Sequence, residues 1–596
     1  MNQGIFSFLL FAFSLFSAQQ KQVQIAFLSD VHFQDLYGSF SDNDFKGIIN
    51  PKTGKPTILR TMDSQLHSTR IFNENYFAFL KALDDIAQKG IKIVAMPGDF
   101  SDDGQTYNIR GLHKILEKYH KKYGIDFYIT TGNHDPVGPF RQDAGKDDFL
   151  GQDGNPLGVY SKENIGKVSN KIITKDIAES GYLEILDELK DFGFYPKKEN
   201  LFWSTPFNFQ SVKNYSYEKA LQKADYSHRM YEVSKGFSVP DLSYVVEPVK
   251  GVWMIAIDGN TYIPKNLNEN PNNPSNYKGA SIGYNNVLTN KKHLIDWVKK
   301  ITQEAKLNGK TVIAFTHYPM IDFNDGATHE IKNLLGEKRW QLERVPDEEV
   351  AKVFAEAGLQ VHFAGHMHIN DTGIRKFGDK ILVNVQVPSL AAYLPAYKIL
   401  TIYSPEKIDV ETKILNDVPD FDELFPLYKK EYEALKRDKN KTLWNKNILK
   451  LKSYHDFMLF HLKELVRLRM IPDDWPKDFI EKAEKLNGED LLLLVQNKNQ
   501  IKEKEINSNA FKIWRFEDLL LDLYKFQSAD ELAKKDIPKE RLQQYQTLEK
   551  LFQENESNDP FIIKLKTVFK ILSLLSNGDP ADHFEIDLKK NEIERM

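Results

Sequence analysis

Short apolar runs alternate with amphipathic segments from residue 23 to about residue 404. Between the apolar runs, hydrophobic residues recur at helical spacing, which predicts helices packed on a sheet. The predicted strands are Val23–Leu28, Ile91–Met96, Phe127–Thr131, Thr311–Thr316, Gln360–Ala364, Ile381–Val385 and Tyr397–Tyr403. The predicted helices are Asn73–Gln88, Ile109–Tyr123, Thr289–Leu307 and Glu348–Ala357. This repeated order of strand and helix indicates an α/β core around a buried sheet.

Residues 136–288 interrupt the alternation and are rich in Gly, Pro and Asn, as in Asn268–Asn276. We interpret this stretch as a large insertion. It contains two largely apolar runs, Leu242–Glu247 and Val252–Asp258, which we expect to form a hairpin in the same core.

The composition changes at about Val418, where glycine becomes rare and Lys, Glu and Leu dominate. Apolar residues follow helical spacing over Leu427–Arg437, Tyr454–Arg469 and Phe516–Tyr524. We therefore predict a mainly helical C-terminal domain over residues 418–596. The pattern leaves open whether this domain docks on the α/β core, walls a site in it, or forms a dimer contact.

The N-terminus carries an apolar run of twelve residues, Ile5 to Phe16, followed by the small residues Ser17 and Ala18. The run is shorter than the roughly 20 residues that a membrane-spanning helix needs. We interpret residues 1–18 as a secretory signal peptide, although no Lys or Arg precedes the run. The expected location is secreted or periplasmic, with no transmembrane anchor after cleavage.

The chain has 596 residues, a formal net charge of −4 and no cysteine. Near-neutral charge argues against a strongly basic nucleic-acid-binding protein, so we expect no stable nucleic-acid complex. The lack of cysteine excludes disulfides, thiolate-bound zinc, iron–sulfur clusters and thiol nucleophiles. Any metal must therefore be bound by nitrogen and oxygen ligands.

Polar clusters directly follow five of the predicted strands. The five clusters are Asp30-Val31-His32, Gly98-Asp99, Gly132-Asn133-His134-Asp135, His317 and Gly365-His366-Met367-His368. In open α/β sheets, ligand sites form at the carboxyl ends of the strands. Each cluster alone has an ordinary structural explanation, such as a turn or a helix cap. Their common position after strands predicts that they converge on one site.

Seven of these side chains are suitable metal ligands: Asp30, His32, Asp99, Asn133, His317, His366 and His368. Imidazole with carboxylate suits zinc, iron or manganese. Seven protein ligands are too many for one ion, so we predict two adjacent metal ions that share a carboxylate. Such a pair supports displacement at phosphorus. We interpret Asp102 and Asp103 as supporting or helix-capping residues rather than ligands.

The series Asp-x-His, Gly-Asp, Gly-Asn-His-Asp, His and Gly-His-x-His resembles the calcineurin-like metallophosphoesterase superfamily over about residues 22–405. The resemblance implies a four-layer α/β sandwich of two mixed sheets flanked by helices, and a dinuclear centre bridged by Asp99 and a hydroxide. One metal would take Asp30, His32 and His368, and the other Asn133, His317 and His366. His134 would act on the phosphoryl group or the leaving oxygen, with Asp135 orienting it.

We therefore expect an exported phosphoesterase with two Mn, Zn or Fe ions, in which the bridging hydroxide attacks a phosphodiester or a phosphomonoester. A diesterase is our preferred interpretation. The alternatives are an acid-phosphatase-like monoesterase and a non-catalytic protein that keeps the fold. Purple acid phosphatases have a tyrosine ligand in a Gly-Asp-x-x-Tyr motif, and Asp102 occupies that position here. The substrate, whether small molecule, nucleotide or lipid headgroup, and the oligomeric state stay open.

Overall fold

A computed structural model describes residues 22–166, 168–495 and 507–596. The predicted signal peptide lies outside these residues. Within the described part of the chain, none of the helices combines the length and the apolar character needed to cross a bilayer.

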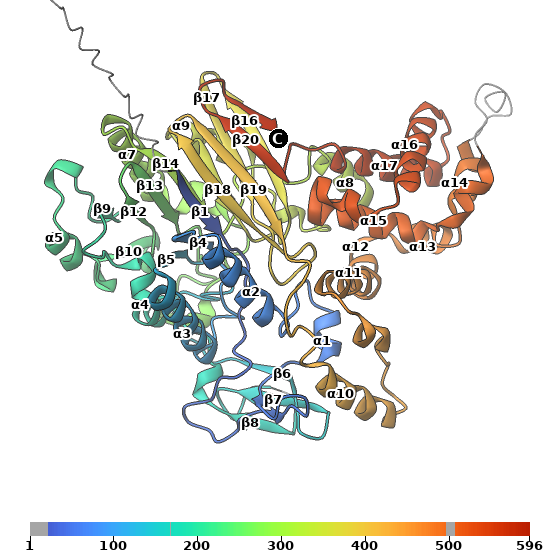
Figure 1. Cartoon of the computed structure of the whole chain (residues 1–596), viewed down its shortest axis with the longest axis horizontal. Coiled ribbons are helices and arrows are strands. Elements are labelled where there is room, and N and C mark those ends of the chain that lie inside the picture. The colour runs from blue at the N-terminus through green and yellow to red at the C-terminus, as the bar shows by residue number, and fades with distance from the viewer. Residues whose placement is uncertain (1–21, 167, 496–506) are drawn as a thin grey trace, which may run out of the picture.

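Two sheets of seven strands each form the centre of the molecule (Figure 1). The first sheet contains, in spatial order, β21 (Glu592–Arg595), β20 (His583–Asp587), β19 (Lys407–Ile414), β18 (Ala396–Ser404), β1 (Val23–Phe27), β4 (Ile93–Pro97) and β5 (Asp126–Thr130). The second contains β16 (Asp371–Phe377), β17 (Lys380–Gln386), β15 (Val361–Ala364), β14 (Thr311–Thr316), β13 (Val252–Ile257), β12 (Tyr244–Val249) and β9 (Phe202–Ser204). Both sheets mix parallel and antiparallel pairs.

The sheets pack face to face through large apolar side chains. The ring of Phe27 on β1 stacks on Phe363 of β15 at a centroid distance of 3.8 Å, and Phe315 of β14 meets Phe27 edge-on at 6.4 Å. All three side chains are almost completely buried. Burial of this kind, on both faces of parallel strands, explains why the strands are near-continuous apolar runs in the sequence.

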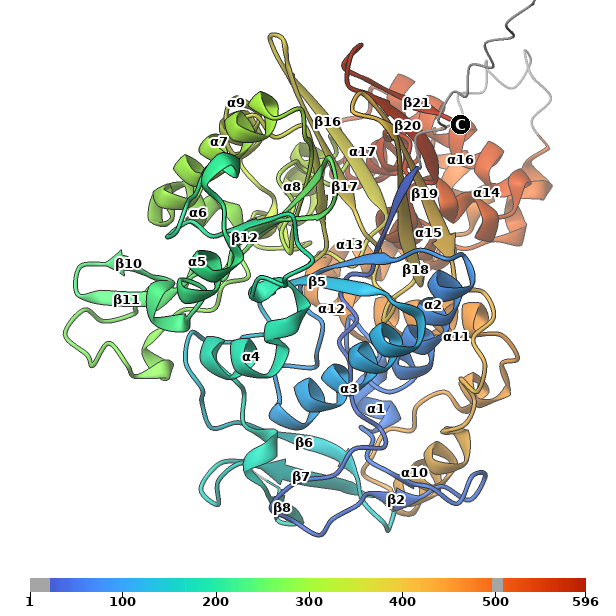
Figure 2. The same ribbon diagram turned by 60° about the vertical axis from the view of Figure 1, so that its left-hand side comes forward.

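Helices cover the outer faces of both sheets (Figure 2). Helices α2 (Asn75–Gln88) and α3 (Thr106–Tyr123) lie along the first sheet, and α7 (Lys292–Leu307) and α9 (Glu348–Glu356) cover the second. The apolar faces of α7 and α9 form one buried cluster with Trp253 and Ile255 of β13. The predicted four-layer α/β sandwich is confirmed.

The insertion over residues 136–288 supplies both core strands and peripheral structure. The two strands expected in the core are β12 and β13, which form an antiparallel pair in the second sheet. The remainder includes the small sheet β6 (Gly145–Leu150), β7 (Pro156–Tyr160) and β8 (Lys171–Ile173), helix α4 (Tyr182–Leu189), and the hairpin β10 (Met230–Ser234) and β11 (Phe237–Pro240). These elements lie at the edge of the α/β core (Figures 1 and 2).

The C-terminal region is mainly helical, as predicted. Its main helices are α10 (Phe425–Arg437), α11 (Tyr454–Leu465), α12 (Ile471–Asp474), α13 (Lys477–Ala483), α14 (Gly488–Val495), α15 (Phe516–Ala529), α16 (Lys539–Glu554) and α17 (Pro560–Leu575). The chain then returns to the first sheet, where β20 pairs antiparallel with β19 and β21 pairs with β20. The sequence pattern did not predict this hairpin, which ties the last residues of the chain to the sheet that contains β1.

Polar contacts also fix this region to the core. The Glu431 carboxylate on α10 accepts hydrogen bonds from the backbone N–H groups of Met62 (2.7 Å) and Asp63 (3.0 Å) at the start of α1 (Met62–Leu66). The Tyr428 hydroxyl donates to Glu74 at 2.7 Å and accepts from Asn73 at 2.9 Å. The helical region therefore docks on the α/β core, which was one of the three arrangements left open by the sequence.

Candidate metal centre

The carboxyl ends of five parallel strands meet between the two sheets. In the first sheet β1, β4 and β5 are parallel neighbours, and in the second β14 and β15 are parallel neighbours. The polar clusters predicted from the sequence begin one to three residues after these strands. Packing of the sheets face to face therefore brings side chains from five separate loops to one place.

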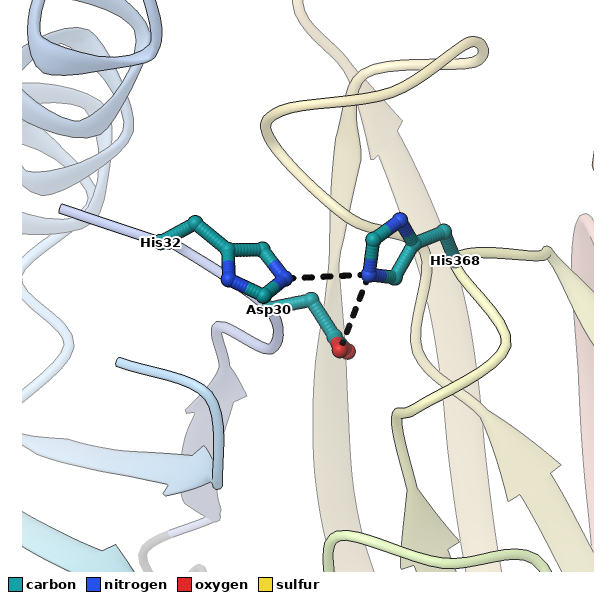
Figure 3. A group of neighbouring side chains, drawn as sticks. All are labelled: Asp30, His32 and His368. Carbon is teal, nitrogen blue, oxygen red and sulfur yellow. Dashed lines mark hydrogen bonds and ion pairs between the residues drawn. The ribbon is translucent and has the colours of Figure 1, made fainter. Parts of the chain in front are cut away.

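The first group of ligand atoms comes from Asp30, His32 and His368 (Figure 3). Nε2 of His32 lies 3.0 Å from Nε2 of His368, which in turn lies 3.4 Å from Oδ1 of Asp30. Asp30 and His32 are fully buried, and His368 is partly exposed. Two imidazole nitrogens and a carboxylate oxygen thus point at a common centre.

The second group surrounds His317. Its Nε2 atom lies 3.1 Å from Oδ1 of Asn133, 3.1 Å from Oδ2 of Asp99 and 3.1 Å from Nδ1 of His366. The same Oδ2 atom of Asp99 lies 3.9 Å from Nε2 of His32 in the first group. Asp99 therefore stands between the two groups, in the position of a shared carboxylate ligand.

The chemistry of this donor set fits two metal ions. A ring nitrogen of neutral histidine carries at most one hydrogen, so Nε2 of His317 cannot satisfy three neighbours that all offer lone pairs. A cation between them would. Burial lowers the pKa of His32 and of His366 well below the usual range, so both imidazoles are held in the neutral form that binds metal. Nitrogen and oxygen donors suit zinc, manganese or iron.

In His317 and His366, a hydrogen bond from the ring nitrogen that points away from the centre fixes which nitrogen faces it. Nδ1 of His317 lies 3.1 Å from the carbonyl oxygen of Pro97, and Nε2 of His366 lies 3.0 Å from that of Ser281. A backbone carbonyl requires the proton on the nitrogen that faces it, which leaves the lone pair of the other nitrogen directed inward.

The backbone at the centre is strained. Five of the seven predicted ligands have a left-handed φ, with values between 44° and 74°; these residues are Asp30, His32, Asp99, His366 and His368. Each such residue costs about 1–3 kcal/mol, and strain of this kind collects at functional sites. The surrounding sheets hold the loops in conformations that their residues would not adopt alone.

Two glycines of the motifs lie so close to the ligands that a side chain would collide. A Cβ on Gly132 would lie 2.2 Å from Oδ1 of Asp99, and one on Gly365 would lie 2.2 Å from Oδ2 of Asp30. Because both contacts are far below van der Waals distance, glycine is required there for the ligand carboxylates to keep their places.

His134 and Asp135 occupy different environments. The Nδ1 atom of His134 contacts the Asp103 carboxylate, which also pairs with Lys146 and with Arg70 at 3.3 Å. The Asp135 carboxylate instead accepts hydrogen bonds from the backbone N–H groups of Phe100 and Ser101, both at 3.1 Å.

The expectation that Asp135 orients His134 is therefore wrong. Asp135 braces the loop after β4, and Asp103 holds the imidazole. The family resemblance implied a pair with the next residue, but the Asp135 carboxylate is turned back toward the loop that follows Asp99. Asp103 lies four residues after Asp99, and the sequence predicts only a supporting or helix-capping role for it. Asp103 has a left-handed φ of 54°, a local backbone conformation that a sequence pattern does not reveal.

A cavity of about 290 Å³ opens onto the centre. His134 lines it together with the predicted ligands Asp99, Asn133, His366 and His368. No described residue makes a hydrogen bond to Nε2 of His134, and the side chain is 29% exposed. His134 therefore presents one ring nitrogen to the cavity, beside the ring of His32 at a centroid distance of 5.1 Å.

The chain was compared with family models, curated proteins and solved structures. A family model described as calcineurin-like phosphoesterase matches residues 23–370. The chain is similar in structure to a dimetal phosphatase from Danio rerio, with 9% identity, a TM-score of 0.33, and coverage of 65% of this chain and 95% of that one. It is also similar to a purple acid phosphatase from yellow lupin (Lupinus luteus) seeds, with 10% identity, a TM-score of 0.29, and coverage of 67% and 52%. None of the curated proteins compared with it matches.

Proposed function

Since this chain belongs to the calcineurin-like phosphoesterase family and is a metal-dependent phosphoric ester hydrolase, we propose that it hydrolyses a small phosphate ester at a two-metal centre. The observation that carries this proposal is the convergence of seven nitrogen and oxygen ligands from five strand ends. A non-catalytic protein that only keeps the fold would be expected to lack part of this set, and the set is complete.

Two groups of side chains would hold the metal pair. Asp30, His32 and His368 form one group, as their mutual distances support. Asn133, His317 and His366 form the other, with Asp99 shared between the groups. When bound, a metal pair of this kind neutralises the phosphate charge and supplies an activated water as nucleophile.

His134 would act on the substrate rather than bind metal. The Asp103 carboxylate accepts a hydrogen bond from Nδ1 of His134, which leaves Nε2 facing the cavity. When the ring carries its second proton, that proton is on Nε2. From there it can hydrogen-bond the phosphoryl group or protonate the leaving oxygen. Burial alone would raise the pKa of the Asp103 carboxyl. The positive charge of Lys146, the contact with His134 and the charge of Arg70 instead hold this pKa well below its usual range. Asp103 is therefore an anion that accepts the Nδ1 hydrogen of His134.

The size of the cavity limits the substrate. At about 290 Å³ it lies at the lower end of the range for small-molecule sites, which is about 300–1,000 Å³. A space of this size suits a small phosphate ester or a headgroup.

We also propose that the protein is exported. The apolar run Ile5–Phe16 and the small residues Ser17 and Ala18 support a cleavable signal. N-terminal sequencing of the protein recovered from the producing cells tests this. A mature chain that starts near Gln19 agrees with export, and a chain that retains Met1 contradicts cleavage.

Hydrolysis of paired chromogenic esters tests the enzymatic proposal. Purified protein is stripped of metal, reloaded with manganese, zinc or iron, and assayed with p-nitrophenyl phosphate and bis-p-nitrophenyl phosphate. We expect turnover that depends on added metal. An Asp99→Ala variant, which lacks the shared carboxylate, should show none. Absence of turnover in folded, metal-loaded wild-type protein with both esters and all three metals would contradict the proposal for substrates of this kind.

A further inference from the structure

The helical C-terminal region forms one wall of the cavity above the metal centre. Six of its residues line the cavity: Arg469, Met470, Asp473, Asp474, Tyr524 and Gln527. The same cavity is lined by His134 and by four of the predicted ligands, Asp99, Asn133, His366 and His368. The substrate site is therefore shared between the two parts of the chain, although the family match ends at residue 370.

A loop of the core links this wall to the metal centre. It follows α8 (Thr328–Leu335) and includes Trp340, whose ring stacks on Tyr524 of α15 at 4.6 Å and 25°. The backbone N–H of Trp340 donates to Asp474 at 3.2 Å, and the Arg339 guanidinium donates to the carbonyl of Asp473. The C-terminal region thus clamps the loop at three points.

The clamped loop is strained where it turns toward the cavity. Trp340 and Gln341 have left-handed φ angles of 57° and 56°. Two consecutive residues with side chains seldom adopt this conformation, and the cost is about 1–3 kcal/mol for each. The ring of Trp340 packs on Tyr524 in this conformation, and the residues that follow the turn, including Arg344, line the cavity.

Three arginines line the cavity, and Arg344 is the one without a hydrogen-bond or ion-pair partner among the described residues. Its guanidinium makes no hydrogen bond or ion pair with any residue that the structure describes, and it is only partly exposed. The other two arginines of the cavity are engaged: Arg70 pairs with Asp102 at 3.0 Å, and Arg469 donates to the carbonyl of His67 at 3.2 Å. A partly desolvated guanidinium without a partner is unfavourable and is well suited to an anionic ligand.

Arg344 lines the same cavity as Asp99 and His366, and its charge acts on these predicted ligands. Burial is the largest cause of the lowered pKa of His366, and the positive charge of Arg344 is the second largest. Burial also lowers the pKa of Arg344 itself, while Glu343 and Asp99 act in the opposite direction. An arginine remains charged at neutral pH under such a shift, because its ordinary pKa is above 12.

We propose that Arg344 binds a non-bridging oxygen of the substrate phosphoryl group and makes the enzyme select phosphomonoesters over phosphodiesters. This inference rests on the proposed function. A monoester carries close to two negative charges near pH 7 and a diester only one. A guanidinium added to a two-metal centre therefore stabilises the monoester more. The geometry thus favours a monoesterase, in place of the diesterase preferred from the sequence.

The test compares Arg344→Gln and Arg344→Lys with the wild-type holoenzyme. The control is Arg375→Gln on β16, which removes the same charge from an exposed pair with Glu348. We expect wild-type kcat/KM to be higher for p-nitrophenyl phosphate than for its diester analogue. Arg344→Gln should lower the monoester value about 10- to 100-fold, as expected for loss of one charge-assisted hydrogen bond, and the diester value less than about threefold. Arg344→Lys should be intermediate, and the control unchanged.

Binding of inorganic phosphate to the metal-loaded protein, measured by calorimetry, gives a readout independent of turnover. Affinity should fall about tenfold or more in Arg344→Gln, with equal metal content and melting temperature. Equal losses for both esters, or unchanged phosphate affinity, would overturn the inference while the proposed function stands. Loss of metal from Arg344→Gln would also overturn it, because Arg344 would then support the metal site. Wild-type protein that hydrolyses neither ester would instead count against the proposed function.

Discussion

The contact between His134 and Asp103 joins two loops that are 31 residues apart in the chain. Asp103 follows β4 and His134 follows β5, and the two strands are parallel neighbours. The pair resembles other arrangements in which a carboxylate fixes the tautomer of a working histidine and stabilises its charged form. Because His134 lines the cavity and Asp103 holds its ring, replacing either residue should change the catalytic rate by a different amount.

Replacing His134 with Ala should lower kcat about 10²- to 10⁴-fold, the usual contribution of a positioned acid or base. Asp103→Asn keeps the shape but removes the charge that holds the imidazole, and should lower kcat about 10- to 100-fold. In both variants the metal content, measured by inductively coupled plasma mass spectrometry, should stay at the wild-type value, since neither residue belongs to the ligand groups.

Asp135→Asn is the informative comparison. The Asp135 carboxylate receives two backbone hydrogen bonds from the loop after Asp99, and burial raises its pKa well above the usual range. This substitution should reduce metal affinity rather than the rate of the fully loaded enzyme. If Asp135→Asn lost rate at full metal occupancy while Asp103→Asn did not, the assignment of His134's partner would be reversed.

The ligands could be predicted from the sequence because each follows a recognisable buried strand. The seven predicted ligand residues lie together, although their role as ligands is still a prediction. The partner of His134 could not be predicted in this way, because it depends on the left-handed turn at Asp103. The unpaired Arg344 carried no signal either, since its place depends on a loop clamped by residues more than 100 positions later.

The loop after β15 needs glycine at position 365, because any side chain there would collide with the loop after β1. A Cβ on Gly365 would lie 1.9 Å from Oγ of Ser29 and 2.2 Å from Oδ2 of Asp30. The backbone N–H of His366 donates to both oxygens of Asp30, at 3.0 and 3.1 Å. The loops after β1 and β15 therefore hold each other through one carboxylate.

Gly365→Ala should displace Asp30 and weaken metal binding at least tenfold, measured by competition with a chelator, with activity lost in parallel. The control is Gly279→Ala, where a Cβ would meet nothing within 4 Å and φ is not left-handed. The control should keep wild-type affinity. Wild-type metal affinity in Gly365→Ala would mean that the two loops can separate without disturbing the site.

The elements of the α/β core follow the apolar pattern closely. Strand β14 has the predicted limits, Thr311–Thr316. The predicted helix Thr289–Leu307 is in fact two helices, α6 (Tyr284–Asn290) and α7, with a non-helical Lys291 between them. Strands β20 and β21 were not predicted, because their alternating polar residues face solvent at a sheet edge and give no continuous apolar run.

Several acidic side chains lie close together where the C-terminal region packs on the α/β core. Asp371 at the start of β16 and Asp530 after α15 are both buried, and Asp325 lies near them. Within the described part of the chain, the nearby Lys398 ammonium donates only to neutral oxygens, those of Asn370, Thr412 and Ala581, at 2.7–2.9 Å. Burial raises the pKa of Asp371 to about 7 and lowers that of Lys398 to about 7.

Asp530 is the least satisfied member of this group. Neither of its carboxylate oxygens has a hydrogen-bond partner among the residues that the structure describes, and the residue is only 2% exposed. Burial, followed by the neighbouring charges of Asp371 and Glu531, raises its pKa well above the usual range, whereas Lys398 acts in the opposite direction. Its φ of 48° is left-handed, a conformation that Asn adopts as readily as Asp.

Asp530→Asn should therefore stabilise the protein in a pH-dependent way. Because the folded-state pKa of Asp530 is raised, the wild-type chain loses stability as pH rises above about 4, where the unfolded carboxyl ionises. The variant removes this loss without changing shape or backbone preference. We expect a gain of about 1–3 kcal/mol in the free energy of unfolding at pH 8, which shrinks toward zero at pH 4.5. Melting curves of both proteins at the two pH values measure it. A variant that is less stable than the wild type at pH 8 would mean that the ionised carboxylate stabilises the junction and that its apparent isolation does not hold in solution.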